Sequence, residues 1–139
     1  MFIIRQFQET DLDDVITLWE ICELSRPWNN PEIDIFRKTA QKDQLFLVAI
    51  KDNELIATVM GGYDGHRGWV NYLAVHPYQQ RNGIATALIQ QLEKRLIALG
   101  CPKLQLLIRK DHIDVQNFYE QLDYQEIEVI CFGKRLIPD

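Results

Sequence analysis

The chain has 139 residues, of which 47% are hydrophobic, 10% aromatic and 25% charged; this predicts one packed domain over residues 1–139 and excludes a disordered or collagen-like chain. The formal net charge is −5, so the sequence lacks the basic surplus that binding to nucleic acid or to anionic lipid usually requires. The longest apolar run, residues 45–50, is far shorter than the roughly 20 residues that span a bilayer, and we expect no membrane partner.

The cysteines and histidines bear on location and on metal binding. Cys22, Cys101 and Cys131 are odd in number and widely spaced, which favours reduced thiols over a disulfide framework. Because the first residues also do not resemble a secretion signal, a cytoplasmic location is expected. No zinc-ligand spacing occurs, so no metal is predicted. Ser25 is the only serine and lacks the surroundings of a serine nucleophile.

The first forty residues predict a strand and two short helices. Residues 1–5 are apolar enough for a first strand. Thr10 is placed to cap a helix whose apolar positions recur at helical spacing from Leu12 to Cys22. Asn30 as a cap, with Pro31 at the first helical position, predicts a second helix that runs to about Ala40.

The middle of the chain predicts an antiparallel meander. Residues 45–51 and 54–61 have strand composition and are joined by Asp52 and Asn53, two residues that tolerate the positive φ of a tight hairpin turn. Residues 61–68 are turn-like, and residues 69–75 are dense in aromatic and β-branched side chains. We therefore expect a further strand there.

The second half begins with the strongest helix pattern of the chain, over residues 83–99. Gly100 suits the left-handed position after its last turn, and Pro102 prevents continuation. A strand over residues 103–109, a helix over residues 113–122 and strands over residues 125–131 and 134–137 are expected to follow.

The loop that enters the strongest helix carries the chemistry. Backbone N–H groups at a helix start have no intrahelical partner, and a glycine lets a ligand approach them closely, so this loop is suited to a pyrophosphate. Arg81 adds positive charge, and Gly83 and the small Ala85 leave the first turn open. Taken alone, the glycine fits an ordinary tight turn equally well. The residues assigned to this loop are Gln80, Arg81, Asn82, Gly83, Ile84 and Ala85.

Two motifs resemble a known family. Residues 80–85 are similar to the Q/R-x-x-G-x-G/A motif of the GNAT superfamily of acyl-CoA-dependent N-acetyltransferases, and they lie, as in that family, between a strand and a long helix. Tyr119 opens a stretch similar to that family's Y-x-x-x-G-F ending. His112 and Asp123 stand where the family often has asparagine and glycine. The resemblance covers nearly the whole chain and is closest to the small bacterial YpeA-type members.

The resemblance implies an α+β fold, with a mixed, mostly antiparallel twisted sheet of about six to seven strands flanked by about four helices. It implies a sheet that splays after the strand ending at Val75, so that pantetheine lies beside Leu73, Ala74 and Val75, whose backbone could supply an oxyanion donor. It also implies that Tyr119 is a general acid that protonates the departing thiolate, which a phenol of pKa ~10 can do at neutral pH.

The implied reaction is transfer of an acetyl group from acetyl-CoA to a primary amine of a small molecule or of a protein or peptide, by direct attack in a ternary complex. No metal takes part, and the protein is expected to be a monomer or a homodimer. The base is open among Asp64, His66 and a water molecule.

Charge placement suggests an acceptor class. Residues 9–34 contain eight acids and one base, and in the GNAT family this region covers the acceptor cleft. We therefore expect a cationic amine, with Trp28 lining its pocket. A solvated acidic helix face is the alternative explanation.

Three rival functions accompany the enzyme, of which one, a nucleic-acid binder, would need a basic face that the composition argues against. A regulatory domain that binds acyl-CoA without turnover would lose no function on Tyr119→Phe. A partner-binding module would bind no CoA at all.

Overall fold

The computed structural model describes all of residues 1–139. It divides into two parts, Met1–Leu106 and Leu107–Asp139, and each is described by itself. The expectation of a single domain over the whole chain stays a prediction.

A five-stranded sheet in the order β1-β2-β3-β4-β5 forms the centre of the first part. Neighbouring strands are antiparallel except for the parallel pair β4 and β5, which confirms a mixed, mostly antiparallel sheet. The expected hairpin is also present, because Asp52 and Asn53 both adopt left-handed φ, 51° and 63°, between β2 and β3. The strands are β1 (Ile3–Gln6), β2 (Phe46–Lys51), β3 (Glu54–Tyr63), β4 (Gly68–Val75) and β5 (Leu104–Leu106).

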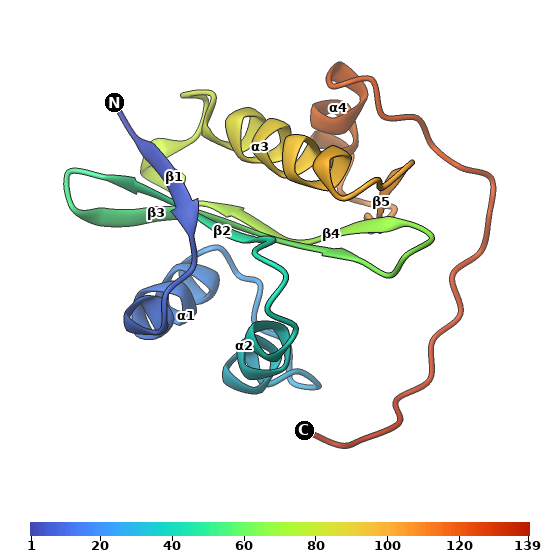
Figure 1. The fold of residues 1–139 in the computed structure, drawn as a ribbon, viewed down its shortest axis with the longest axis horizontal. Helices are drawn as coiled ribbons and strands as arrows, with labels where there is room; N and C mark the ends of the chain where they lie inside the picture. Colours follow the sequence, from blue (N-terminus) through green and yellow to red (C-terminus); the bar gives the residue numbers. More distant parts are fainter. The chain divides into compact units, whose positions relative to one another are not determined.

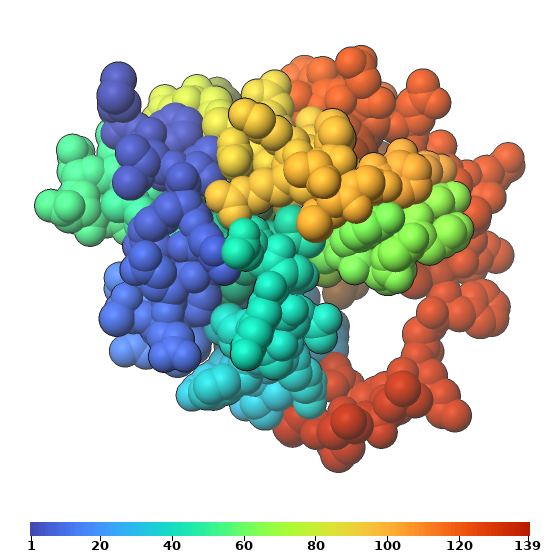
Figure 2. All heavy atoms as spheres, in the orientation of Figure 1, coloured from blue at the N-terminus to red at the C-terminus, as the bar shows by residue number.

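Helices α1 (Leu12–Ile21) and α2 (Pro31–Ala40) cover one face of the sheet, as Figure 1 shows. In the space-filling view the blue N-terminal segment and the teal α2 region lie side by side (Figure 2). The side chain of Asn30 accepts from the N–H groups of Glu32 and Ile33, at 3.0 and 3.2 Å, so the predicted cap of α2 is confirmed.

The predicted cap of α1 is wrong. Thr10 lies inside a short 3-10 turn, Glu9–Asp11, that precedes the helix. The physical reason is the carboxylate of Asp11, which accepts from the N–H of Gln8 at 2.8 Å and pairs with the guanidinium of Arg5 at 2.8 Å. That pair holds residues 8–11 in a turn of their own, and α1 begins one residue later.

Helix α3 (Ile84–Ala98) covers the opposite face (Figure 1). Its buried side chains include Leu88, Ile89 and Leu92, as the apolar stripe predicted. Gly61 lets it approach closely, because a Cβ atom on Gly61 would overlap the side chain of Leu92. Gly100 takes the expected left-handed position after the last turn, with φ 85°.

The second part contains helix α4 (Ile113–Gln121). It ends in a Schellman arrangement: the N–H groups of Asp123 and Tyr124 donate to the carbonyls of Glu120 and Tyr119, each at 3.0 Å. Asp123 takes the left-handed position, φ 69°, so an aspartate fills the place where the GNAT family often has glycine.

The expected strand count was too high. Residues 125–131 and 134–137 form no strand, and the strand expected over residues 103–109 is only Leu104–Leu106. An apolar alternation becomes a strand only where a partner strand and a core face receive it. Val129, Ile130 and Phe132 are instead largely exposed.

No helix of the structure combines the length and the apolar character that crossing a bilayer requires.

Candidate active site

The outer edge of β4 is only partly paired. Strand β5 pairs with Gly68, Trp69 and Val70 and goes no further. From Asn71 to Val75 that edge of β4 has no partner strand, whereas its other edge continues to pair with β3 as far as Val75. Leu73, Ala74 and Val75, the residues expected to accompany pantetheine, therefore lie on an open sheet edge, where backbone groups can bind an extended ligand.

The end of this edge is tied to two other elements. The carbonyl oxygen of Val75 accepts from the thiol of Cys22 and from the side-chain amide of Gln80, each at 3.4 Å. Burial raises the pKa of the Cys22 thiol, so the thiol stays protonated at neutral pH. Cys22 is then a packing residue at the end of α1, and Gln80 links the loop to the strand.

The loop between β4 and α3 turns through two left-handed residues, Arg81 with φ 67° and Gly83 with φ 76°. Arg81, Asn82 and Gly83 are exposed, Ala85 is half-buried, and Ile84 is buried beneath the first turn. The structure thus brings the predicted loop residues to one place, at the end of the open β4 edge.

The start of α3 is free of protein caps. Gly83 occupies the N-cap position, and no side chain there accepts a hydrogen bond from the first turn. The N–H groups of that turn have no intrahelical partner, and the helix dipole favours an anion beside them. A Cβ atom on Gly83 would meet no heavy atom within 4 Å, so there is space on that side for a phosphate group.

The sequence did not predict one feature of this edge, the backbone conformation of Tyr72. Tyr72 has φ 49°, and the β3–β4 register shifts between Thr58 and Met60, so β4 carries a bulge at this point. The Tyr72 ring stacks on Trp19, with centroids 3.7 Å apart, and its hydroxyl donates to Asp34 at 2.7 Å. A lone aromatic residue gives no signal for a left-handed bulge, since this backbone conformation is rare in such residues.

The candidates for the base differ in their surroundings. The carboxylate of Asp64 accepts from the N–H groups of His66 and Arg67, at 2.8 and 2.7 Å, and from Trp69 Nε1 at 3.4 Å. Hydrogen bonds, first from Arg67 and then from His66, lower the pKa of Asp64. These contacts make Asp64 a residue that stabilises its own turn and weaken it as a base. His66 is an exposed residue of the same turn.

Tyr119 lies on α4, in the second part of the chain, whereas the loop and the open edge lie in the first part. Within its own part its ring makes edge-on contacts with Phe118 and Tyr124, with centroids 5.0 and 5.4 Å apart. Tyr119 is 4% exposed, and burial raises the pKa of its phenol. The group is therefore a neutral proton donor throughout the physiological range. His112 occupies the N-cap position of α4, but its side chain makes no capping hydrogen bond.

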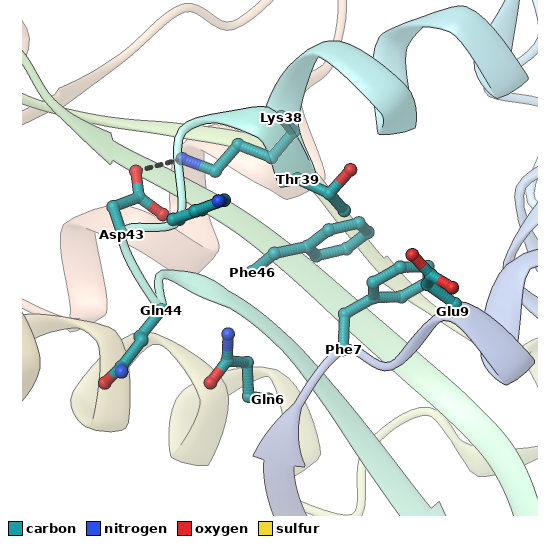
Figure 3. A pocket seen from close by; sticks show the side chains of 9 residues that line it. Gln6, Phe7, Glu9, Lys38, Thr39, Asp43, Gln44 and Phe46 are labelled. Carbon is teal, nitrogen blue, oxygen red and sulfur yellow. Dashed lines mark hydrogen bonds and ion pairs between the residues drawn. The ribbon is translucent and has the colours of Figure 1, made fainter.

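A cavity of about 150 Å³ lies elsewhere, between the N-terminal segment and the end of α2 (Figure 3). The stacked rings of Phe7 and Phe46 form one wall, and Lys38 and Asp43, which also line the cavity, form an ion pair at 2.6 Å. None of the residues predicted to bind acetyl-CoA lines this cavity. The site inferred from the sequence is an open strand edge and a helix start.

Known proteins resemble the chain over nearly its whole length. The family model described as "Acetyltransferase (GNAT) family" matches residues 12–124. A Pectobacterium atrosepticum protein named as an acetyltransferase is 54% identical over 136 residues, which cover 98% of this chain and 96% of that protein.

Solved structures share the fold at lower identity. The structure of AAC(6′)-Iy in complex with the bisubstrate analogue CoA-S-monomethyl-acetylneamine matches with a TM-score of 0.75 at 16% identity, covering 99% of each chain. The ribosomal-protein-S18-alanine N-acetyltransferase from Escherichia coli matches with a TM-score of 0.73 at 23% identity, covering 91% of this chain and 79% of that one. The family match and the close relative together establish that this chain belongs to the GNAT family of acetyltransferases.

Proposed function

We propose that the protein transfers the acetyl group of acetyl-CoA directly to a primary amine, with both substrates bound at once. Residues 80–85 and the first turn of α3 bind the pyrophosphate, and the β4 edge at Leu73, Ala74 and Val75 binds pantetheine through backbone hydrogen bonds. The observation that carries this proposal is the continuity of the open β4 edge with an uncapped helix start at Gly83.

The chemistry needs no covalent enzyme intermediate. The lone pair of the neutral amine attacks the thioester carbonyl carbon, and a backbone N–H of the β4 edge stabilises the resulting oxyanion. The C–S bond then breaks, and the sulfur takes a proton from the phenol of Tyr119. A water molecule or His66 accepts the proton that the nitrogen loses, because Asp64 is occupied by its own turn.

The fold leaves the size of the acceptor open. The structures that share it include a complex with an acetylneamine analogue and an enzyme named for a ribosomal protein. Both a small amine and a protein amine are compatible with the family. The chemical class of the acceptor is therefore inferred from residues of this chain.

The first experiment measures the thermal stability of the protein with acetyl-CoA and with CoA. A ligand at 100 times its dissociation constant adds about 2.7 kcal/mol of stability, which raises the melting temperature by several degrees. No shift at millimolar acetyl-CoA would refute the donor site.

The second experiment compares the wild type with Tyr119→Phe. Loss of the proton donor is expected to slow acetyl transfer by at least about tenfold, within the range of general acid catalysis. The dissociation constant for acetyl-CoA should stay within twofold. Tyr124→Phe, which alters the neighbouring ring, is the control. Equal rates for wild type and Tyr119→Phe would remove Tyr119 from the mechanism.

A further inference from the structure

The bulge residue Tyr72 is held by three side chains in a conformation that tyrosine rarely adopts. Its ring stacks on Trp19, its carbonyl accepts from the hydroxyl of Thr58 at 2.9 Å, and its own hydroxyl donates to Asp34 at 2.7 Å. A left-handed φ costs a residue with a Cβ atom about 1–2 kcal/mol. Strain of this kind persists where the surroundings enforce it, and such places are often functional sites.

The Asp34 contact brings a carboxylate from α2 to the strand at the point where β4 loses its partner. Tyr72 lies one residue before Leu73, on the stretch that β5 leaves unpaired. Asp34 is in the first turn of α2, which the cap at Asn30 fixes. Its position is therefore set from both sides, by the helix start and by the tyrosine hydroxyl.

The residue next to Tyr72 on β4 is exposed to solvent. Asn71 lies opposite Met60 in the sheet register, and Met60 belongs to the core beneath α1 and α2. Residues directly opposite share a face, so Asn71 lies on the same face as Asp34, and it is exposed. The charge of Lys38, on the same helix, is matched by Asp43. The half-buried Asp34 carboxylate thus lies on the sheet face that also carries the exposed Asn71.

The carboxylate cannot also serve the nitrogen that attacks the thioester. Asp34 meets the hydroxyl of Tyr72, at the far end of that side chain from the backbone edge where the thioester is expected. A carboxylate bound to the attacking nitrogen would in addition keep it protonated and unreactive. A positive charge bound by Asp34 would therefore lie several bonds away from the nitrogen that is acetylated.

We propose that Asp34 is the specificity-determining residue of the acceptor site, and that the acceptor is a small diamine or polyamine whose second ammonium group binds this carboxylate. The inference rests on the proposed function. A carboxylate has two oxygens and about four lone-pair positions, so it can accept from Tyr72 and from an ammonium group together. Both hydrogen bonds fix the orientation of the far end of the acceptor.

The experiment uses two amines of equal chain length, cadaverine and pentylamine, which differ only in the second ammonium group. Transfer is followed by release of free CoA from acetyl-CoA. For the wild type we expect kcat/KM at least about tenfold higher for cadaverine, the effect of one charge-assisted contact. In Asp34→Asn, which keeps an acceptor for the Tyr72 hydroxyl, the ratio should fall to within about threefold of unity, mainly through KM for cadaverine.

Two further variants separate charge recognition from folding. Glu32→Gln removes an exposed acid from the same helix turn and should leave the ratio unchanged. Tyr72→Phe keeps the stacked ring, frees the carboxylate and should lower the ratio partly. Melting temperatures of all variants are compared with that of the wild type.

The outcomes distinguish this inference from the proposed function. No stabilisation by acetyl-CoA would refute the donor site itself. Stabilisation by acetyl-CoA, with no preference for cadaverine, with an unchanged preference in Asp34→Asn or with no turnover of either amine, would overturn the role of Asp34 alone.

Discussion

The indole N–H of Trp19 donates to the hydroxyl oxygen of Thr58 at 2.9 Å, inside a core where Thr58 is fully inaccessible and Trp19 is 1% exposed. The same hydroxyl donates to the carbonyl of Tyr72. One threonine on β3 thus satisfies polar groups of α1 and of the β4 bulge, which joins the helical layer to the strand expected to bind the thioester.

Thr58→Val tests this junction, because valine has nearly the same shape but no hydroxyl. The variant leaves the indole N–H buried without a partner, and we expect the free energy of unfolding to fall by about 1–3 kcal/mol. Denaturation by urea measures it. Thr86→Val, a half-buried position on α3, is the control and should change the free energy by less than about 1 kcal/mol. Equal losses in the two variants would show that the Thr58 hydrogen bonds contribute nothing.

Gly83→Ala tests the helix start. Alanine at φ 76° should cost about 1–2 kcal/mol of stability, and its methyl group would occupy the space assigned to the phosphate. Calorimetry with acetyl-CoA is therefore expected to show affinity at least about tenfold lower, through lost backbone contacts at the helix start. Gly65→Ala is the matched control, because Gly65 also has a positive φ, 90°, and a Cβ atom there would meet no heavy atom within 4 Å. Gly65→Ala should lose stability but keep affinity, and equal affinity in both variants would argue against phosphate binding at Gly83.

Cys22 is expected to react slowly with alkylating reagents. Burial raises the pKa of its thiol, so little of the reactive thiolate exists at pH 7.5. Cys131 is exposed and gives the internal comparison in the same sample. Peptide mapping after treatment with iodoacetamide should find Cys131 modified first. Since the thiol of Cys22 contacts Val75, bound acetyl-CoA should slow the alkylation of Cys22 further. Labelling of Cys22 faster than of Cys131 would contradict the burial of Cys22.

The buried phenol of Tyr119 should make the free energy of unfolding fall at alkaline pH. Its pKa in the folded protein is raised by burial, while in the unfolded chain a tyrosine ionises near ~10. The folded state therefore holds a proton that the unfolded state releases, so the stabilising contribution is complete below pH ~10 and falls as the pH rises from there toward the folded pKa.

Tyr119→Phe should abolish this part of the alkaline slope. Urea unfolding at pH 8, 9.5 and 10.5 measures it for the wild type and for the variant. Tyr78→Phe changes a tyrosine that is 90% exposed and should leave the slope as it is in the wild type. A wild-type slope in Tyr119→Phe would mean that the phenol ionises normally.

The local signals in the sequence predicted the elements well. Asn30 before Pro31, Asp52 with Asn53, and Gly100 each act through their own backbone conformation or a neighbouring N–H group, so a short window contains the cause. The loop at Gly83 is also a local signal, because the glycine and the helix pattern that follows it are enough to predict an open helix start.

The parts that escaped prediction depend on distant residues. The contacts of Tyr72 join it to Trp19 and Asp34, which are 53 and 38 residues away, and no pattern near residue 72 contains them. The apolar alternation over residues 125–131 predicted a strand, but pairing depends on a neighbouring edge that the segment does not specify. The position of Tyr119 relative to the β4 edge is likewise a long-range property.

The close packing of α3 on Gly61 links the proposed cofactor site to a residue outside it. A side chain at position 61 would displace Leu92, and a helix moves largely as a rigid rod. Ile84 precedes Leu92 by eight residues, or about 12 Å of helix at 1.5 Å per residue. Where α3 rather than the Leu92 side chain gives way to a larger residue 61, the amide groups of the first turn move with the helix. The close approach of α3 to β3, on which the geometry of the proposed cofactor site depends, thus requires that residue 61 lack a methyl group beneath the middle of the helix.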